Sequence, residues 1–394
     1  MSISLYHQVG HNANWNSESF VADSCGDGLI LSPVHQSQSQ IEHMSAEIKQ
    51  HCIFDPQYYL PNSKKDKLNS YTFFPQALSG GFSTKTFPTI ALDSAKKCIN
   101  FQLAQDFEKL IIPARYFDQM DPDYTEKQEL YTVNAFLEAI SKPKTQKPVY
   151  LTLPLTSHMI EHKKYRNMIL NWATSFPEID GIYVIADYQR NTKQIQSEPF
   201  LDAYLEFITE LREAGLEVLV GYLNTESLVL SLIDGSSLTF GSFENTRMFS
   251  IDKFLVDTEE RRGPTPRIYL PGLLNWLQLN QAKQLKKINP KLWGQIYFPT
   301  TYAEEVLIAA VEPTFNQPGL YKHYFVCFTD QVNQLKVLKP KDRYDKLRKW
   351  IQNAIEYYKE VDKLPIDLDA HGKGEHLKPW LNSIKRYFTD YLSA

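Results

Sequence analysis

The segment Ile182-Tyr183-Val184-Ile185-Ala186-Asp187-Tyr188-Gln189-Arg190 is an apolar run that ends on polar and ionisable side chains. Three other runs have the same form, at residues 52–57, 110–115 and 238–247. Buried parallel strands read as continuous apolar runs, and residues just past their C-terminal ends line the active sites of α/β barrels. The four runs therefore predict buried parallel strands and the edge of the sheet at which a site lies.

Strand-like and helix-like segments alternate outward from this run. The expected strands are residues 28–33, 52–55, 109–114, 148–154, 181–186, 217–222, 237–241, 267–270 and 294–299. Amphipathic stretches separate most of them, a pattern that predicts βα units and a parallel sheet. Nine candidates are close to the eight strands of a (β/α)8 barrel, with one candidate left as an added edge element or a misread segment.

A doubly wound open sheet is the competing architecture. Such a sheet usually carries a glycine-rich phosphate turn after its first strand. Here the first expected strand runs into Leu31-Ser32-Pro33-Val34-His35-Gln36, which contains no glycine. The sequence therefore favours a TIM-barrel-like α/β fold.

Three segments are expected along the chain. Residues 1–20 are polar and predict an N-terminal lead-in, and residues 21–310 predict the TIM-barrel-like catalytic domain. Residues 311–394 predict a mostly helical C-terminal extension, with helices at 344–361 and 376–392 and one more strand at 324–328.

Composition restricts the class of protein. The chain has 394 residues, of which 43% are hydrophobic, and no run approaches the roughly 20 apolar residues that a membrane-spanning helix needs. The N-terminus lacks a secretion signal, and the four cysteines form no Cys-x-x-Cys pair, so we expect a soluble protein of the reducing cytoplasm. Residues 320–394 carry 14 Lys or Arg against 10 Asp or Glu, but both signs are interspersed, which favours solvated helix faces over nucleic-acid binding.

Three carboxylates follow expected strands: Asp55, Asp187 and Glu244. Carboxylates that face one cavity can divide into acid and base, or into nucleophile and base, because burial and mutual repulsion separate their pKa values. This set predicts cleavage or exchange at a glycosidic or N-glycosidic bond. The alternative is that these residues cap helices or pair with nearby arginines.

Further polar residues near the strand ends are candidates for substrate binding. They are Gln57, Arg115, Gln189, Asn245, Arg247 and His323. Arginine recognises carboxylate or phosphate with a planar fork, so Arg115 and Arg247 predict an anionic group on the substrate unless they form structural salt bridges. Residues 241–247 are the best single segment for a binding loop.

Two motifs resemble metal sites. His158-Met159-Ile160-Glu161-His162 matches the H-x-x-E-H pattern of some zinc proteases, but two lysines follow it, and an exposed helix start capped by Ser157 is the favoured interpretation. Residues 367–376 contain Asp, His and Glu, yet their glycines and alternating charges are typical of a linker. We therefore expect no metal and no cofactor.

One short resemblance to a known family is present. Pro266-Arg267-Ile268-Tyr269-Leu270-Pro271-Gly272 resembles the Pro-Arg-Tyr-Leu-Met-Gly strand of tRNA-guanine transglycosylases, which are barrels that use two aspartates to exchange a base. The resemblance covers seven residues, and the cysteine-rich zinc motif of that family is missing from this chain.

Two functions follow as hypotheses. The first is a hydrolase or transferase that acts on a small polar substrate, such as a sugar, nucleoside or nucleotide, through Asp55 and Asp187. The second is a barrel without catalysis that serves as a subunit or recognition platform, with a protein partner on the C-terminal helices. Nucleic acid is a weaker third partner, and no membrane association is expected.

Overall fold

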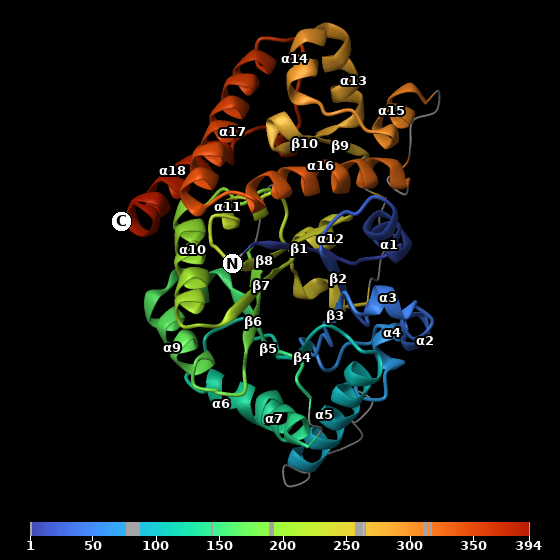
Figure 1. The fold of residues 1–394 in the computed structure, drawn as a ribbon, viewed down its shortest axis with the longest axis vertical. Coiled ribbons are helices and arrows are strands. Elements are labelled where there is room, and N and C mark those ends of the chain that lie inside the picture. Colours follow the sequence, from blue (N-terminus) through green and yellow to red (C-terminus); the bar gives the residue numbers. More distant parts are fainter. Residues whose placement is uncertain are drawn as a thin grey trace.

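A single parallel sheet forms the centre of the molecule. The computed structural model describes residues 2–75, 87–142, 145–188, 193–256, 263, 265–309, 314 and 317–393. Among these residues, eight parallel strands form one sheet in the order β3-β2-β1-β8-β7-β6-β5-β4 (Figure 1). The strands are β1 (Ser4–Gln8), β2 (Gly28–Leu31), β3 (Cys52–Phe54), β4 (Leu110–Ile112), β5 (Val149–Thr156), β6 (Gly181–Asp187), β7 (Glu217–Gly221) and β8 (Ser236–Gly241).

The sheet curves into a nearly closed barrel. The first strand, β1, pairs with both β2 and the last strand β8, so that Tyr6 lies opposite Gly28 on one side and Thr239 on the other. The two edge strands of the sheet, β3 and β4, also approach each other. The backbone N–H of Glu108, just before β4, donates to the carbonyl of Cys52 in β3 at 2.8 Å. The expectation of an α/β, TIM-like barrel is confirmed.

The expected polar lead-in was wrong for residues 4–8, because they form β1. Its polar side chains His7 and Gln8 are buried and hydrogen-bonded. His7 Nε2 donates to the carbonyl of Cys25 at 2.9 Å, and the His7 ring packs 4.2 Å from that of Phe240. Because His7 and Gln8 are polar, this strand lacks the continuous apolar run that is typical of a buried parallel strand.

Three expected strands are not part of the barrel. β9 (Arg267–Leu270) pairs antiparallel with β10 (Asn275–Gln278) in a separate hairpin. The strand expected at residues 294–299 is wrong, because residues 290–296 form helix α14. The Asn289 side chain caps this helix by accepting from the Leu292 N–H, and Pro290 takes the first helical position. Residues 324–328 lie inside helix α16.

Helices cover the outside of the barrel. In the first half they are α1 (Ala13–Ala22), α2 (Gln38–Glu42), α3 (Ala46–Lys49), α4 (Asp66–Asn69), α5 (Phe87–Ala104), α6 (Tyr124–Gln128) and α7 (Asn134–Ser141). The π-helical turn η2 (Glu129–Val133) joins α6 to α7. Then follow α8 (Ser157–Glu161), α9 (Lys163–Ala173), α10 (Glu198–Glu213), α11 (Ser227–Leu230), α12 (Glu244–Arg247) and the 3-10 turn η3 (Ile251–Phe254).

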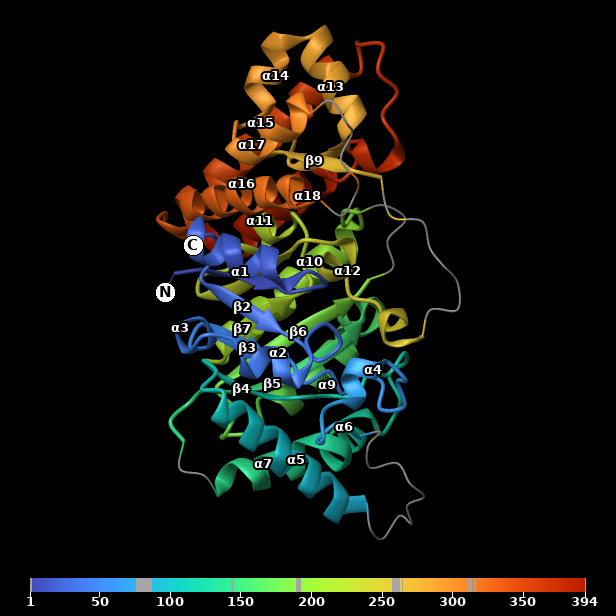
Figure 2. The ribbon, with the colours of Figure 1, turned by 90° about the vertical axis from the view of Figure 1, so that its right-hand side faces the viewer.

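The C-terminal part forms a mostly helical layer on one side of the barrel (Figures 1 and 2). Besides the β9-β10 hairpin it holds η4 (Pro271–Leu273), α13 (Leu279–Ile288), α14 (Pro290–Ile296), α15 (Thr301–Ile308), α16 (Pro318–Lys336), α17 (Pro340–Val361), η5 (Ala370–Gly372), α18 (Leu377–Tyr387) and η6 (Phe388–Leu392).

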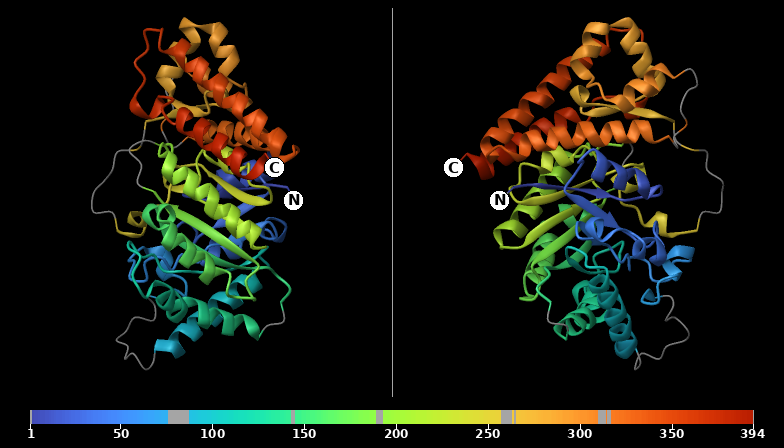
Figure 3. Two further views of the ribbon diagram at one scale, coloured as in Figure 1. Left: turned by 90° about the vertical axis from the view of Figure 1, so that its left-hand side faces the viewer. Right: turned by 45° about the vertical axis from the view of Figure 1, so that its right-hand side comes forward.

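Two helices of this layer attach it to the barrel. Phe325 of α16 packs edge-on against Phe240 of β8 at 5.4 Å. In α18, Arg386 pairs with Asp202 of α10 at 2.7 Å, and Trp380 Nε1 donates to the carbonyl of Ile195 at 2.9 Å. The two chain ends lie on the same side of the molecule (Figure 3).

Candidate active site

Asp55 follows β3 directly and is fully buried at the C-terminal end of the barrel. The Tyr59 hydroxyl donates to both carboxylate oxygens at 2.9 Å, and the Gln57 N–H donates to Oδ1 at 3.0 Å. Burial raises the pKa of Asp55 to about 6, although these donors and the ammonium group of Lys253 oppose the rise. Asp55 therefore titrates near neutral pH, in the range useful for an acid or base.

Lys253, which the sequence did not single out, lies beside Asp55. Its ammonium group is buried and has no hydrogen-bond partner among the described residues. Nζ lies 3.6 Å from the ring centroid of Tyr222 and 5.2 Å from the ring centroids of Phe249 and Phe254. Burial lowers the pKa of Lys253 to about 7, while the charge of Asp55 raises it. In the sequence, the signal for a buried lysine is its place between Phe249 and Phe254.

Gln57 and Tyr222 hold this part of the mouth in a constrained conformation. Both have positive φ angles, of 57° and 56°, which non-glycine residues adopt rarely. The Gln57 side chain donates to the Tyr222 hydroxyl at 3.1 Å and accepts from the Val34 N–H at 3.2 Å. Gln57, expected to bind substrate, is thus occupied by protein contacts that position Tyr222.

Asp187 ends β6 and is also buried. The Tyr116 hydroxyl donates to Oδ2 at 2.5 Å, whereas Oδ1 is buried and has no hydrogen-bond partner among the described residues. Burial raises the pKa of Asp187, with a further contribution from Asp252, and the Tyr116 hydrogen bond opposes it. One oxygen of this carboxylate therefore keeps its lone pairs unused.

Phe249 connects the surroundings of the two aspartates. Its ring lies 5.3 Å from that of Tyr59, which holds Asp55, and 5.9 Å from that of Tyr116, which holds Asp187. The ring of Tyr222 also packs against Phe249, with 5.4 Å between the two ring centroids. Strands β3 and β6 thus bring their carboxylates to one aromatic cluster at the barrel mouth.

Glu244 and Asn245, also expected at the site, lie on α12 away from this cluster. Glu244 pairs with Lys193 and its side chain is 46% exposed. Asn245 is exposed as well. The contacts of Glu244 therefore lie with the loop after β6, and not with Asp55 or Asp187.

The two arginines occupy aromatic surroundings. The guanidinium carbon of Arg115 lies 4.0 Å from the ring centroid of Tyr131, and the Gln128 side chain bonds to both the N–H and the carbonyl of Arg115. Arg247 lies between the barrel and the C-terminal layer, 4.2 Å from the ring centroid of Trp276. Burial lowers the pKa of both arginines.

His323 does not reach the barrel mouth. It lies in α16, where Nε2 donates to the carbonyl of Tyr269 and Nδ1 accepts from the Thr300 hydroxyl, both at 2.9 Å. Burial lowers its pKa to about 4, so it stays neutral as a structural group of the C-terminal layer. Gln189, the remaining candidate, lies outside the described residues.

The two metal-like motifs are arranged differently from metal sites. His158 and Glu161 lie on α8, a helix capped by Thr156 in place of the expected Ser157, and the His162 ring stacks on Tyr165 at 4.2 Å. In the other motif, Asp369 pairs with Arg267. Within the described part of the chain, no three His, Cys, Asp or Glu side chains gather as metal ligands.

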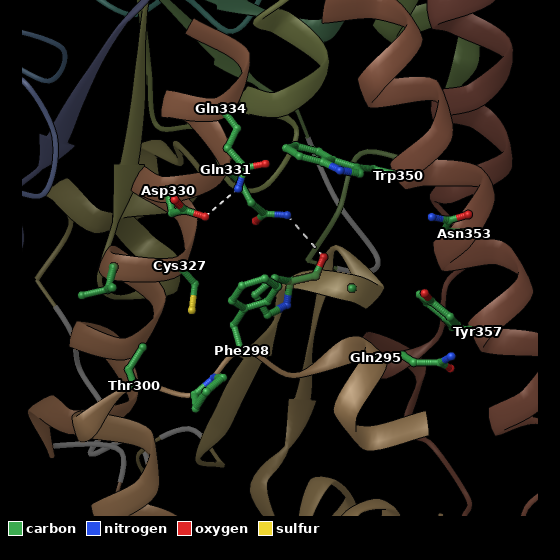
Figure 4. Close-up of a pocket in the computed structure, with 14 residues that line it drawn as sticks. Gln295, Phe298, Thr300, Cys327, Asp330, Gln331, Gln334, Trp350, Asn353 and Tyr357 are labelled. Atoms are coloured by element: carbon green, nitrogen blue, oxygen red, sulfur yellow. Dashed lines mark hydrogen bonds between the residues drawn. The ribbon is translucent and has the colours of Figure 1, made fainter. Parts of the chain in front are cut away.

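A separate cavity of about 460 Å³ lies within the C-terminal layer (Figure 4). Its lining includes the aromatic residues Phe298, Trp350 and Tyr357, together with amide side chains such as Gln295 and Asn353. None of its lining residues comes from a barrel strand, so this cavity is distinct from the barrel mouth.

Comparisons with known proteins add no assignment. None of the helices in the described residues is long and apolar enough to span a membrane. No protein-family model matches the chain, and no curated protein is significantly similar to it.

Proposed function

We propose that the chain is an enzyme that cleaves or transfers at a glycosidic or N-glycosidic bond in the barrel mouth. The observation that carries the proposal is the pair of buried aspartates. Asp55 and Asp187 each follow or end a barrel strand, and each accepts from a tyrosine that packs on Phe249. Active sites of α/β barrels lie at this end of the strands.

Asp55 suits the role of general acid. Its pKa of about 6 leaves part of the carboxyl protonated near neutral pH, so that it can protonate the departing oxygen or nitrogen. Lys253, with a pKa of about 7, lies beside it as a group that exchanges a proton in the same range. The constrained backbone at Gln57 fixes the Asp55 side chain through one of its hydrogen bonds.

Asp187 suits the role of nucleophile or base. In the described part of the chain no group bonds to its Oδ1, while Tyr116 donates to Oδ2 and thereby fixes the orientation of the carboxylate. Such an oxygen can attack an anomeric carbon or activate a water molecule, depending on its separation from the acid. The buried rings of Tyr222 and Phe249 keep the surroundings of the two aspartates apolar.

The proposal is tested with a panel of aryl glycosides, nucleosides and nucleotides, with release of the sugar or base followed by chromatography. We expect Asp55→Asn and Asp187→Asn each to lower kcat by about 10²-fold or more, because each removes a group that moves a proton or attacks in the transition state. Asp345→Asn, on the solvated face of α17, is the matched control and is expected to keep full activity.

A non-catalytic recognition platform is the second candidate, and the cavity of the C-terminal layer favours it. That cavity combines aromatic rings with amide groups, the composition of a binding site for small polar ligands. If no compound of the panel is turned over, and ligand binding depends on Trp350 but not on Asp55 or Asp187, the platform replaces the enzyme as the proposed function.

A further inference from the structure

We propose that Arg247, Trp276 and Tyr324 form a binding site for a phosphate group, at the junction between the barrel and the C-terminal layer. Arg247 ends α12, shortly after barrel strand β8, while Trp276 lies in β10 and Tyr324 in α16. The site goes beyond the proposed function, since phosphate binding there requires neither Asp55 nor Asp187.

Three side chains from separate elements enclose the site. The guanidinium carbon of Arg247 lies 4.2 Å from the ring centroid of Trp276 and 5.7 Å from that of Tyr324, and the two rings lie 4.5 Å apart. Arg247 is 5% exposed, Trp276 2% and Tyr324 0%. The cluster is therefore shielded from water.

Each of these side chains holds a buried donor without an acceptor. Within the described residues, no hydrogen bond reaches Nε or Nη1 of Arg247, Nε1 of Trp276 or the hydroxyl of Tyr324. Buried polar groups are paired in the great majority of cases, and an unpaired buried charge is especially costly. Several such donors in one place indicate that an acceptor with several oxygens belongs among them.

Arg343 shows what a purely structural buried arginine looks like in this chain. It is 1% exposed, and its guanidinium group donates to the carbonyls of Leu335, Ser231 and Leu338 and to the carboxylate of Asp234. Nε and Nη1 of Arg247, by contrast, have no hydrogen-bond partner among the described residues. The difference points to a ligand as the missing partner of Arg247.

The other charges around Arg247 define the kind of anion. Arg267 and Lys193 add positive potential, although they pair with Asp369 and Glu244. Glu226, a buried carboxylate in the loop after β7, adds a negative charge that acts on Arg247 and Tyr324. A carboxylate accepts but does not donate, so Glu226 suits the P–OH of a singly protonated phosphate.

The position in the fold supports the same ligand. Phosphate sites of α/β barrels are frequently built from the loops after strands seven and eight. Here the loop after β7 carries Glu226, and the segment after β8 carries Arg247. Neither the position nor the donor set depends on the chemistry proposed for the barrel mouth.

Calorimetric titration of the full chain with inorganic phosphate tests the site, at pH 6.5 and with sodium chloride keeping the ionic strength constant. We expect saturable binding of one equivalent. Arg247→Gln should weaken it about tenfold or more, and Tyr324→Phe, which keeps the ring, about fivefold, because charged and neutral hydrogen bonds differ in strength. Lys346→Gln, which removes a surface charge of α17, and Asp55→Asn should bind phosphate as the unaltered chain does.

Titrations with other anions test whether the bound phosphate is free or part of a larger molecule. Tighter binding of ribose 5-phosphate than of inorganic phosphate assigns the group to a larger substrate, and equal binding assigns it to free phosphate. Sulfate, which carries no proton for Glu226, should bind more weakly than phosphate. The proposal is overturned if the unaltered chain shows no saturable phosphate binding, or if Arg247→Gln and Tyr324→Phe, shown by their melting curves to be folded, bind phosphate equally well.

Discussion

At the scale of single residues, the barrel mouth is dominated by two buried groups of opposite charge. Asp55 and Lys253 both titrate near neutral pH because burial disfavours the charged form of each, and each charge partly relieves the other. Lys253 has no hydrogen bond to Asp55 among the described contacts, so the interaction acts through space. The two side chains therefore titrate as a coupled pair, and a change in the charge of one shifts the pKa of the other.

Replacement of the lysine should shift the titration of the aspartate. In Lys253→Met, the cation that favours the ionised carboxylate is gone, so we expect the pKa of Asp55 to rise above its value of about 6. Titration of the carboxyl carbon by NMR measures the shift. An unchanged or lower pKa would contradict the assignment of Lys253 as a neighbour that stabilises the carboxylate, and Lys346→Met on α17 provides the control.

Asp55 should also make stability depend on pH. Its pKa is raised in the folded chain from an ordinary 3.8 to about 6, so its contribution to stability is full below pH 3.8 and is lost as the pH rises through about 6. We expect the free energy of unfolding of the unaltered chain, relative to Asp55→Asn, to fall by about 1–3 kcal/mol between pH 4 and pH 8. Urea denaturation at a series of pH values measures it, and a relative stability that rises over this range would contradict the raised pKa.

At the scale of elements, close contacts between neighbouring strands fix the side chains at the mouth. A Cβ atom added at Gly221 of β7 would lie 2.6 Å from the ring of Tyr183 on β6. Tyr183 is buried and donates to Gln8 of β1 at 3.2 Å, so its ring has no room to move aside. The glycine thus allows three barrel strands to share one buried tyrosine.

Gly221→Ala should therefore destabilise the barrel. We expect a loss of about 1–3 kcal/mol, because the methyl group overpacks a filled interior. Gly294→Ala, at an exposed position of α14 where a Cβ meets no atom within 4 Å, is the matched control and should gain up to about 1 kcal/mol. Equal effects of the two substitutions in chemical denaturation would contradict the packing argument.

The sequence predicted most elements of the barrel for identifiable reasons. β6 and β8 are continuous apolar runs, and their ends are close to the expected positions. β1 was missed because two of its side chains are polar yet buried on opposite faces: His7 packs outward against Phe325 of α16, and Gln8 faces Tyr183 inside the barrel. Residues 324–328 were misread as a strand because α16 is buried on several sides, so that its aromatic residues look continuous in the sequence.

At the scale of the whole molecule, a buried tryptophan and a pair of solvent-exposed ion pairs attach the C-terminal layer to the barrel. Trp380 of α18 is 0% exposed and donates to the carbonyl of Ile195, and Arg386 pairs with Glu198 and Asp202 of α10. The face of α18 that carries these residues is therefore occupied by contacts with the barrel. A partner that binds the C-terminal helices would have to use their remaining faces.

Trp380→Ala should measure the strength of this attachment. We expect it to lower the free energy of unfolding by about 3–5 kcal/mol, because it leaves a large cavity and an unpaired carbonyl at Ile195. Trp350→Ala, at a partly exposed wall of the cavity in Figure 4, should cost less. A cost at Trp380 no larger than that at Trp350 would show that the layer is only loosely attached.

The amino-acid sequence was enough to predict the parallel barrel and the edge at which its polar groups lie, because apolar runs and strand ends are local properties of the chain. It also predicted Asp55 and Asp187 as carboxylates at strand ends. The groups around them follow from the folded chain alone: Lys253 and Phe249 lie about 200 residues from Asp55 in the sequence, and Glu244 pairs with Lys193 instead. Burial, charge and hydrogen bonding at a site depend on which distant segments meet there, and no local pattern records that meeting.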